Sequence, residues 1–108
     1  MVNAHYAEAK GSDSYDGIAS YKRYGELLER DDIDGVIIAL PDHWHGLASI
    51  DAMRAGKDVF CEKPLAHTVR EGRAMADAVK KYGRVGQTGS MQRSWRNFRH
   101  ACELVQNG

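Results

Sequence analysis

Lys63, preceded by Glu62 and followed by Pro64, is the side chain of this sequence best placed to do chemistry. The three residues follow an apolar run, V-F-C from Val59, which is typical of a buried strand, and Pro64 prevents that strand from continuing as a paired one. A partly desolvated lysine can polarise a hydroxyl or a carbonyl, or take part in its proton transfer. A surface lysine paired with the neighbouring glutamate is the alternative. The stretch therefore favours a site of proton transfer at the end of a strand.

A second cluster of polar and aromatic side chains is P-D-H-W-H, residues 41–45. Its two histidines and one aspartate could indicate a metal site, but His43 and His45 are two residues apart at the start of a predicted helix and do not face each other. We therefore expect no metal ion there. Asp42 is in a position to cap the helix, and Trp44 can either stack on a ligand ring or pack on the neighbouring loop.

Strands and helices alternate along the chain. Residues 34–41, D-G-V-I-I-A-L-P, form a β-branched run without polar alternation, which is typical of a strand covered on both faces in a parallel sheet. Further strands are predicted over residues 58–62 and 84–88, and a short one over residues 18–21. Helices are predicted over Val2–Lys10, 24–30, 42–55, Val69–Tyr82 and 97–105, the fourth of them opened by a capping box between Thr68 and Glu71.

The order of these elements predicts a parallel sheet flanked by helices, which is half of a doubly wound, Rossmann-like α/β domain. Because the carboxyl ends of parallel strands share one edge, residues 41–45, 62–64 and 87–93 are expected to converge. The last segment supplies polar side chains, and its Gly89 would let the backbone approach a ligand closely. Ligand chemistry is therefore expected at this edge.

The composition is that of one soluble globular unit or a piece of one, with 108 residues, 43% of them hydrophobic, and 15 basic against 15 acidic side chains. The charges are interspersed, so no sustained positive field favours nucleic acid or an anionic bilayer. Cys61 and Cys102 do not make a disulfide framework, and no apolar run is long enough to span a membrane. Nothing at the amino terminus is typical of an export signal, which predicts a cytoplasmic chain unless a signal precedes it.

Three segments of the sequence carry a resemblance to a known family. I-D-G-V-I-I-A-L-P-D-H-W-H-G, A-G-K-D-V-F-C-E-K-P-L and Y-G-R-V-G-Q-T-G-S-M-Q-R-S resemble consecutive blocks of the Gfo/Idh/MocA oxidoreductases. The similarity runs over nearly all of residues 21–108, and it is specific in combination because P-D-H-W-H and E-K-P lie a helix length apart. The resemblance implies NAD or NADP as the cofactor.

The resemblance also implies roles for particular residues. Lys63 would be the catalytic residue, near the nicotinamide and the substrate, and Glu62 would contact the cofactor ribose or orient Lys63. Cofactor contacts are implied for Leu40, Pro41, Asp42, His45, Glu62, Lys63, Pro64 and Gln92. Substrate contacts are implied for Lys63 and Arg93. The peptide bond between Lys63 and Pro64 could be cis or trans.

The reaction that the resemblance implies is hydride transfer between the nicotinamide and a sugar, a polyol or a related hydroxylated compound. An NAD-dependent glycosidase of the same superfamily is an alternative, because the D-H-W-H form also resembles those enzymes. A non-catalytic binding module or a decayed fragment is a second alternative. The substrate would be a small molecule, and the full-length protein would be a homo-oligomer.

The family's glycine-rich turn, G-x-G-x-x-G, is absent from these 108 residues. By resemblance, residues 1–108 would form an incomplete NAD(P)-binding Rossmann domain that lacks the first strands, and a C-terminal substrate domain would also lie outside the chain. Those strands would separate the 18–21 strand from the 34–41 strand, so their loss would leave unpaired edges. We therefore expect the isolated chain to be marginally stable, aggregation-prone or rearranged.

Overall fold

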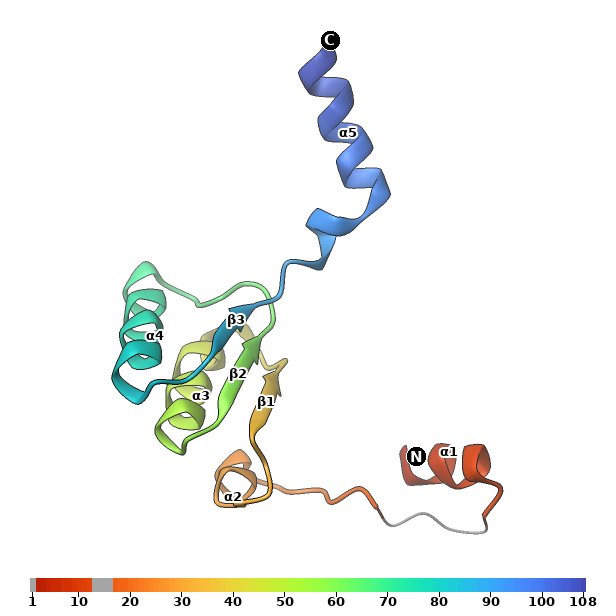
Figure 1. Ribbon diagram of the computed structural model, residues 1–108, viewed down its shortest axis with the longest axis vertical. Helices are drawn as coiled ribbons and strands as arrows, with labels where there is room; N and C mark the ends of the chain where they lie inside the picture. Colours follow the sequence, from red (N-terminus) through yellow and green to blue (C-terminus); the bar gives the residue numbers. More distant parts are fainter. Residues whose placement is uncertain (1, 13–16) are drawn as a thin grey trace.

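A three-stranded parallel sheet forms the centre of the computed structural model, which describes residues 2–12 and 17–108 (Figure 1). The strands are β1 (Gly35–Ile38), β2 (Asp58–Cys61) and β3 (Gly86–Thr88), and they lie side by side in the order of the sequence. The middle strand, β2, buries Val59 and Cys61. The predicted parallel, Rossmann-like arrangement is confirmed, although each strand is shorter than the apolar run that predicted it.

The helices of the described chain are α1 (Val2–Lys10), α2 (Tyr24–Leu28), α3 (Asp42–Arg54), α4 (Val69–Tyr82), the 3-10 helix η1 (Met91–Ser94) and α5 (Arg96–Asn107). The bounds of α4 match the prediction because both of its ends are specified locally. Thr68 Oγ1 accepts from the Glu71 amide at 3.2 Å, and the Glu71 carboxylate accepts from the Thr68 amide at 3.0 Å. Gly83, with φ +62°, takes the left-handed conformation that ends the helix.

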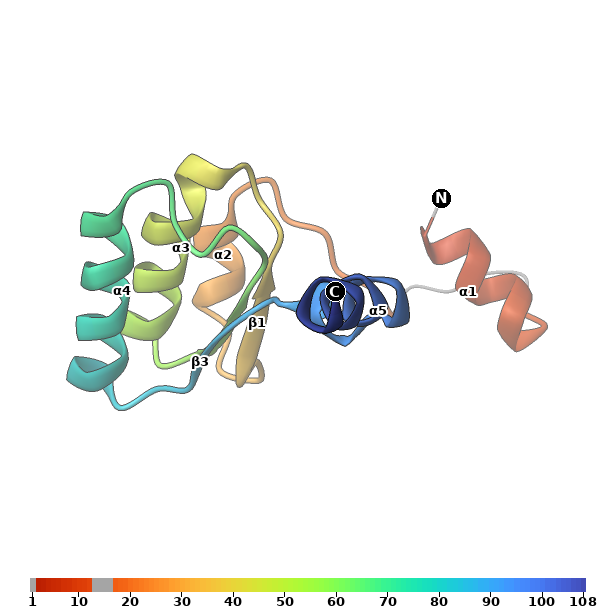
Figure 2. The ribbon, with the colours of Figure 1, turned by 90° about the horizontal axis from the view of Figure 1, so that it is seen from above.

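The hydrophobic core lies between the sheet and the helices α3 and α4, which cover one face of it (Figure 2). Its buried members come from β1, β2 and the facing sides of the two helices: Ile38, Ala48, Ala52, Met53, Val59, Cys61, Met75 and Ala78. The helices approach closely at Gly46, where an added Cβ would lie 3.3 Å from the Cβ of Glu71. A glycine at this position therefore sets the spacing of α3 and α4 next to the start of both helices.

Two predictions about strands are wrong. Residues 18–21 are not a strand, because this exposed segment runs past the sheet without pairing to it. The run over residues 34–41 was expected to be covered on both faces, yet the Ile37 side chain is 76% exposed while its neighbour Ile38 is 6% exposed. The reason is that α3 and α4 lie on the Ile38 face, and in the described parts of the chain no helix packs on the Ile37 face.

The helices α1 and α5 extend away from the sheet, so the chain measures 58 × 39 × 22 Å (Figure 1). The α5 helix confirms the prediction over residues 97–105, and its apolar side chains Phe98 and Val105 are exposed. None of the described helices is both long enough and apolar enough to cross a bilayer.

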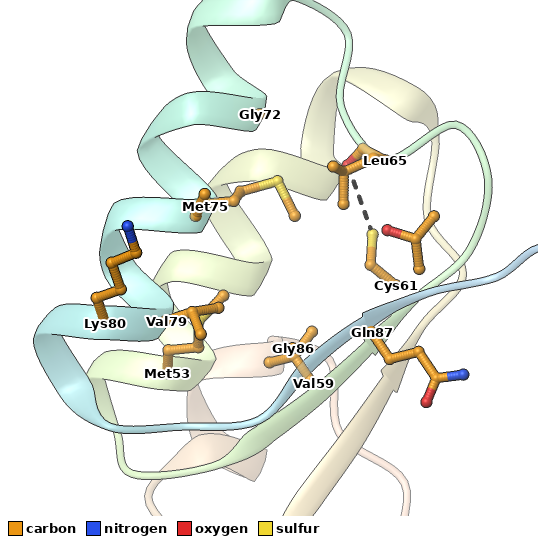
Figure 3. Close-up of a pocket in the computed structure, with 12 residues that line it drawn as sticks. Met53, Val59, Cys61, Leu65, Gly72, Met75, Val79, Lys80, Gly86 and Gln87 are labelled. Atoms are coloured by element: carbon orange, nitrogen blue, oxygen red, sulfur yellow. Dashed lines mark hydrogen bonds between the residues drawn. The ribbon is translucent and has the colours of Figure 1, made fainter.

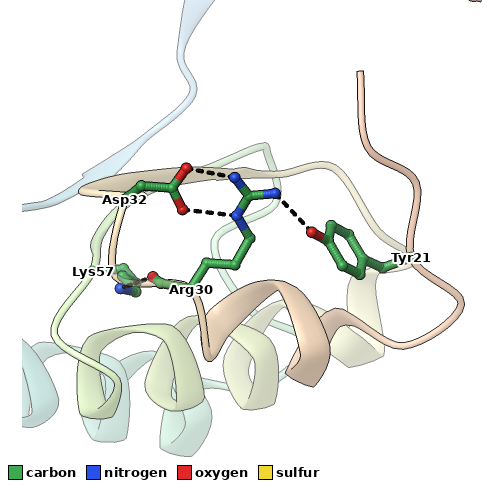
Figure 4. Close-up of polar contacts among 4 residues, drawn as sticks. All are labelled: Tyr21, Arg30, Asp32 and Lys57. Atoms are coloured by element: carbon green, nitrogen blue, oxygen red, sulfur yellow. Dashed lines mark hydrogen bonds and ion pairs between the residues drawn. The ribbon is translucent and has the colours of Figure 1, made fainter. Parts of the chain in front are cut away.

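A buried lysine fastens the turn before β2 to the loop before β1 (Figure 4). Lys57 is only 6% exposed, and its ammonium donates to the Arg30 carbonyl at 2.6 Å. The Arg30 guanidinium in turn pairs with both carboxylate oxygens of Asp32 and donates to the Tyr21 hydroxyl at 2.7 Å. These contacts hold the amino-terminal ends of β1 and β2 together, at the end of the sheet opposite the candidate site.

Candidate functional site

The carboxyl ends of the three strands are aligned at one edge of the sheet. Ile38, Cys61 and Thr88 occupy the same rung of the sheet. The Glu62 amide donates to the Ile38 carbonyl at 2.9 Å, and the Gly89 amide donates to the Cys61 carbonyl at 2.8 Å. The residues that follow each strand therefore begin at a common level, which is where ligands bind in open parallel sheets.

The Glu62 side chain lies directly over Gly89. An added Cβ on this buried glycine would lie 2.8 Å from Glu62 Oε2 and 3.2 Å from its carboxyl carbon. The same carboxylate oxygen accepts a hydrogen bond from the Lys63 amide at 3.3 Å. The prediction that Gly89 admits a ligand is therefore corrected, because the Glu62 carboxylate takes that space. The signal in the sequence for this contact was the glycine directly after β3, Gly89, at the level where Glu62 directly follows β2.

Lys63 is exposed at this edge, and across residues 2–12 and 17–108 no ion pair involves its ammonium. The neighbouring carboxylate of Glu62 bonds the Lys63 backbone amide instead. The alternative of a surface ion pair between these two residues is therefore not found. The peptide bond between Lys63 and Pro64 is cis.

The segment after β1 leads directly into α3. Pro41 occupies the N-cap position, and its carbonyl accepts from the Trp44 amide at 2.8 Å. The prediction that Asp42 caps this helix is wrong by one residue, since Asp42 is the first helical residue. Its exposed carboxylate lies in the first turn, where negative charge is favourable. Leu40, which is 40% exposed, presents an apolar surface next to it.

His45 lies inside the protein rather than on the wall of the edge. Its side chain is 1% exposed, and both ring nitrogens face backbone carbonyls, with Nδ1 2.6 Å from the Pro64 oxygen and Nε2 2.7 Å from the Leu40 oxygen. Trp44, by contrast, is 43% exposed, and its ring is tilted by 46° to that of His43, with ring centroids 6.2 Å apart. The sequence did not reveal the two carbonyl partners of His45, because they depend on how two loops meet.

The third segment that was predicted to converge at this edge, residues 87–93, leads away from it after Gly89. Gln92 and Arg93 belong to η1, beyond the end of β3, and they line a hollow together with Phe98, Arg99 and Cys102. Among the described contacts, neither Gln92 nor Arg93 reaches Glu62 or Lys63. The structure therefore brings together the segments after β1 and β2, while the Gln92 and Arg93 side chains lie apart from them.

An apolar cavity of about 340 Å³ lies between α4 and β3, on the helix side of the sheet (Figure 3). Cys61, Met53 and Met75 are among its lining residues, and the Cys61 thiol points to the Leu65 carbonyl at 3.7 Å. Burial raises the pKa of this thiol. A protonated, apolar-lined thiol behind the strand end is a packing group, so the polar chemistry belongs to the sheet edge.

The exposed and half-buried groups at the sheet edge suit the ribose and nicotinamide portion of a dinucleotide. The carboxylates of Asp42 and Glu62 can accept hydrogen bonds from ribose hydroxyls, the Lys63 ammonium can donate, and Leu40 offers an apolar surface to a ring. No glycine-rich turn that could hold a pyrophosphate is present in the sequence. Nor, within the described residues, do any three His, Cys, Asp or Glu side chains lie close enough together to hold a metal ion.

Solved structures share this fold over almost the whole chain. The myo-inositol 2-dehydrogenase from Lactobacillus plantarum matches with a TM-score of 0.69 and 32% identity, over 96% of this chain and 30% of that one. A 3-ketoreductase from Actinomadura kijaniata, solved in complex with NADP and TDP-benzene, matches with a TM-score of 0.70 and 26% identity, over 98% of this chain and 31% of that one.

Sequence comparison adds a relative of another activity. The alpha-N-acetylgalactosaminidase of Shewanella oneidensis is 50% identical over 58 residues, which are 54% of this chain and 13% of that protein. The chain spans less than a third of the length of each of these three proteins. The model of the Gfo/Idh/MocA oxidoreductase family, described as having an NAD-binding Rossmann fold, matches residues 1–90. Together with the strand-end geometry, this match shows that the chain belongs to the Gfo/Idh/MocA family of oxidoreductases.

Proposed function

We propose that this chain supplies part of the active site of an NAD(P)-dependent oxidoreductase that acts on a sugar, a polyol or a related hydroxylated compound. The observation that carries the proposal is the exposed Lys63 ammonium, which has no ion-pair partner among the described residues and lies where β1 and β2 both end. The nicotinamide, when bound, supplies hydride exchange with a substrate carbon. Lys63 Nζ then donates a hydrogen bond to the substrate oxygen and takes part in proton transfer at that oxygen.

The neighbouring residues would orient the cofactor and the lysine. Glu62 Oε2 accepts from the Lys63 amide, which leaves Oε1 to accept from a ribose hydroxyl. Leu40, Pro41 and Asp42 would line the opposite side of the same ligand, with the Asp42 carboxylate as a second acceptor. Pro64 fixes the direction in which the chain leaves the site. Gln92 and Arg93 stay proposed contacts of the nicotinamide and the substrate, and their support is the family resemblance alone.

The test uses the longest reading frame that contains this chain, incubated with NAD⁺ or NADP⁺ and a panel of sugars and polyols while nicotinamide absorbance is followed. Lys63→Met is expected to lower kcat at least about 100-fold, because a general acid–base group contributes that much, while cofactor affinity stays close to wild type. Lys22→Met, at an exposed lysine away from the site, is the matched control and should retain full activity. A Lys63→Met enzyme with wild-type kcat would refute the role of Lys63.

A glycosidase is a second candidate, favoured by the 50% identity with the Shewanella enzyme over 58 residues. In this reaction the sugar would give a hydride to NAD⁺, the leaving group would then be eliminated, water would add to the double bond so formed, and the hydride would return to the sugar. Lys63 would serve the proton transfers in both cases, so the two candidates share one site. Release of the aglycone from a chromogenic glycoside, without net consumption of NAD⁺, would select the glycosidase.

A further inference from the structure

His45 is a buried polar side chain placed between two loops of the candidate site. It is the fourth residue of α3, and its side chain is 1% exposed. The next residue, Gly46, faces Glu71 on α4. The imidazole therefore points away from solvent, toward the loop that follows β2, and cannot itself touch a ligand that lies on the sheet edge.

Each ring nitrogen of His45 faces a carbonyl oxygen from a different loop. Nδ1 lies 2.6 Å from the oxygen of Pro64, in the loop after β2, and Nε2 lies 2.7 Å from the oxygen of Leu40, in the loop after β1. A carbonyl oxygen only accepts hydrogen bonds. When the ring carries a proton on each nitrogen, both contacts are therefore hydrogen bonds, and when the ring is neutral only one of the two contacts is a hydrogen bond. The neutral ring bonds one loop and only contacts the other, so the ring that carries a proton on both nitrogens is the form that hydrogen-bonds both loops.

We propose that His45 is a positioning residue, which ties the carbonyl of Leu40 to that of Pro64 and so fixes how far Lys63 lies from the cofactor-binding residues after β1. The inference rests on the proposed function. Pro64 has no amide hydrogen, so on the carboxyl side of Lys63 the Pro64 carbonyl is the backbone group that can be held, while the Lys63 amide on the other side is bonded by Glu62. One contact is made at Pro64, directly after Lys63, and the other at Leu40, two positions before Asp42.

A positioning role can be separated from mere packing by comparing two buried residues on the same helix. Ser49 lies one turn after His45 and is 0% exposed, and among the described residues its hydroxyl makes no hydrogen bond to either loop. Ser49→Ala therefore perturbs the same helix without breaking a bond to either loop. His45→Leu removes both donors, and His45→Gln keeps an amide that can bond one of the two carbonyls.

The first measurement is amide hydrogen exchange of residues 40–42 and 62–65 in the cofactor-free protein, using the longest reading frame that contains this chain. His45→Leu is expected to speed exchange in both segments, His45→Gln in one of them, and Ser49→Ala in neither. Unchanged exchange in His45→Leu would overturn the tie. Because no cofactor or substrate is present, this result stands even if the proposed reaction is wrong.

The second measurement is steady-state kinetics at a temperature where each variant is fully folded. His45→Leu is expected to lower kcat/KM about 10- to 100-fold, as loss of an orienting residue behind an active-site group does. His45→Gln is expected to fall between His45→Leu and wild type, and Ser49→Ala should stay within about twofold of wild type. A folded His45→Leu enzyme with wild-type kcat/KM would show that the tie serves stability only and would overturn the positioning role.

If His45→Leu does not fold, His45→Gln decides the question by the same two readings. Faster exchange in one segment together with a lower kcat/KM supports the proposal, and wild-type values of both overturn it. A wild-type protein that shows no turnover with any nicotinamide cofactor would instead refute the proposed function.

Discussion

The Glu62 carboxylate occupies the space in which a side chain at Gly89 would have to begin. Glu62 follows β2 and Gly89 follows β3. The ends of these two strands therefore pack together because the long side chain of Glu62 lies where Gly89 has no side chain. Through its bond to the Lys63 amide, the same carboxylate connects this contact to the proposed catalytic lysine.

Replacing Gly89 with alanine is therefore expected to displace the Glu62 carboxylate. The added Cβ would lie 2.8 Å from Oε2, so the side chain must rotate and the bond to the Lys63 amide is lost. We expect a loss of about 1–3 kcal/mol in the free energy of unfolding, measured in urea, and, if the proposed reaction holds, a kcat/KM about 10-fold lower or more for the longest reading frame that contains this chain.

Two controls accompany the Gly89→Ala variant. Gly25→Ala, where nothing lies within 4 Å of the added Cβ, should be neutral or slightly stabilising. In a double-mutant cycle, Gly89→Ala should cost much less when Glu62 is already alanine, because the clash is with that side chain. Equal costs in both backgrounds would contradict the contact.

The capping box at the start of α4 should have a measurable effect on stability. Thr68→Ala removes the hydroxyl that accepts from the Glu71 amide, and it should lower the free energy of unfolding by about 1 kcal/mol in urea titration. Thr68→Ser keeps the hydroxyl and should stay close to wild type. Equal stability of the alanine and serine variants would mean that the cap contributes nothing in solution.

Ile37 and Ile38 are neighbours with opposite surroundings, and they test which face of β1 is covered. In the isolated chain, Ile37→Lys should change the free energy of unfolding by no more than about 0.5 kcal/mol, because the site is 76% exposed. A charge on an exposed edge strand should also reduce aggregation, measured by light scattering. Ile38→Lys, at a site 6% exposed, should abolish cooperative unfolding. If both variants unfold, the Ile37 face is covered in solution.

The two cysteines should differ sharply in reactivity. Cys102 on α5 is exposed, while burial both shields the Cys61 thiol and raises its pKa. At pH 8, iodoacetamide should label Cys102 quickly and Cys61 only in urea. In the Cys102→Ser variant Cys61 is the one cysteine left, so its slow labelling can be measured alone.

The raised pKa of Cys61 also fixes the sign of a pH effect on stability. A folded-state pKa above that of the unfolded chain contributes stability below the ordinary thiol range, ~8.5, and this is lost as pH rises through the raised value. Cys61→Ser should therefore reduce the loss of stability between neutral pH and pH 10. An unchanged pH dependence would contradict the burial of this thiol.

The elements that could be predicted from the sequence are those fixed by local chemistry. The α4 helix has a capping box at one end and a left-handed glycine at the other, and both its bounds were predicted. The parallel order of the strands followed from alternating apolar runs and helices. The strand over residues 18–21 failed because a short β-branched or aromatic segment becomes a strand only beside a partner.

The contacts inside the candidate site were less predictable, because they depend on where loops meet. The sequence placed Glu62, Lys63 and Asp42 at one edge, and the parallel register puts the segments that contain them there. It gave no indication that the His45 ring would be enclosed by two carbonyls, or that Gly89 would receive the Glu62 side chain. Backbone acceptors carry no signature in the residue types, so only the structure reveals them.

The spatial order of the strands, β1-β2-β3, has a consequence for how the protein is made. Each strand pairs with the one synthesised just before it; α3 packs on β1 and β2, and α4 packs on α3. The loop that must close before each pair of strands forms is therefore only about one helix and one strand long, and such short separations in sequence favour rapid folding. As the polypeptide leaves the ribosome, β1 and α3 can receive β2, and the resulting unit can receive β3, before later residues emerge.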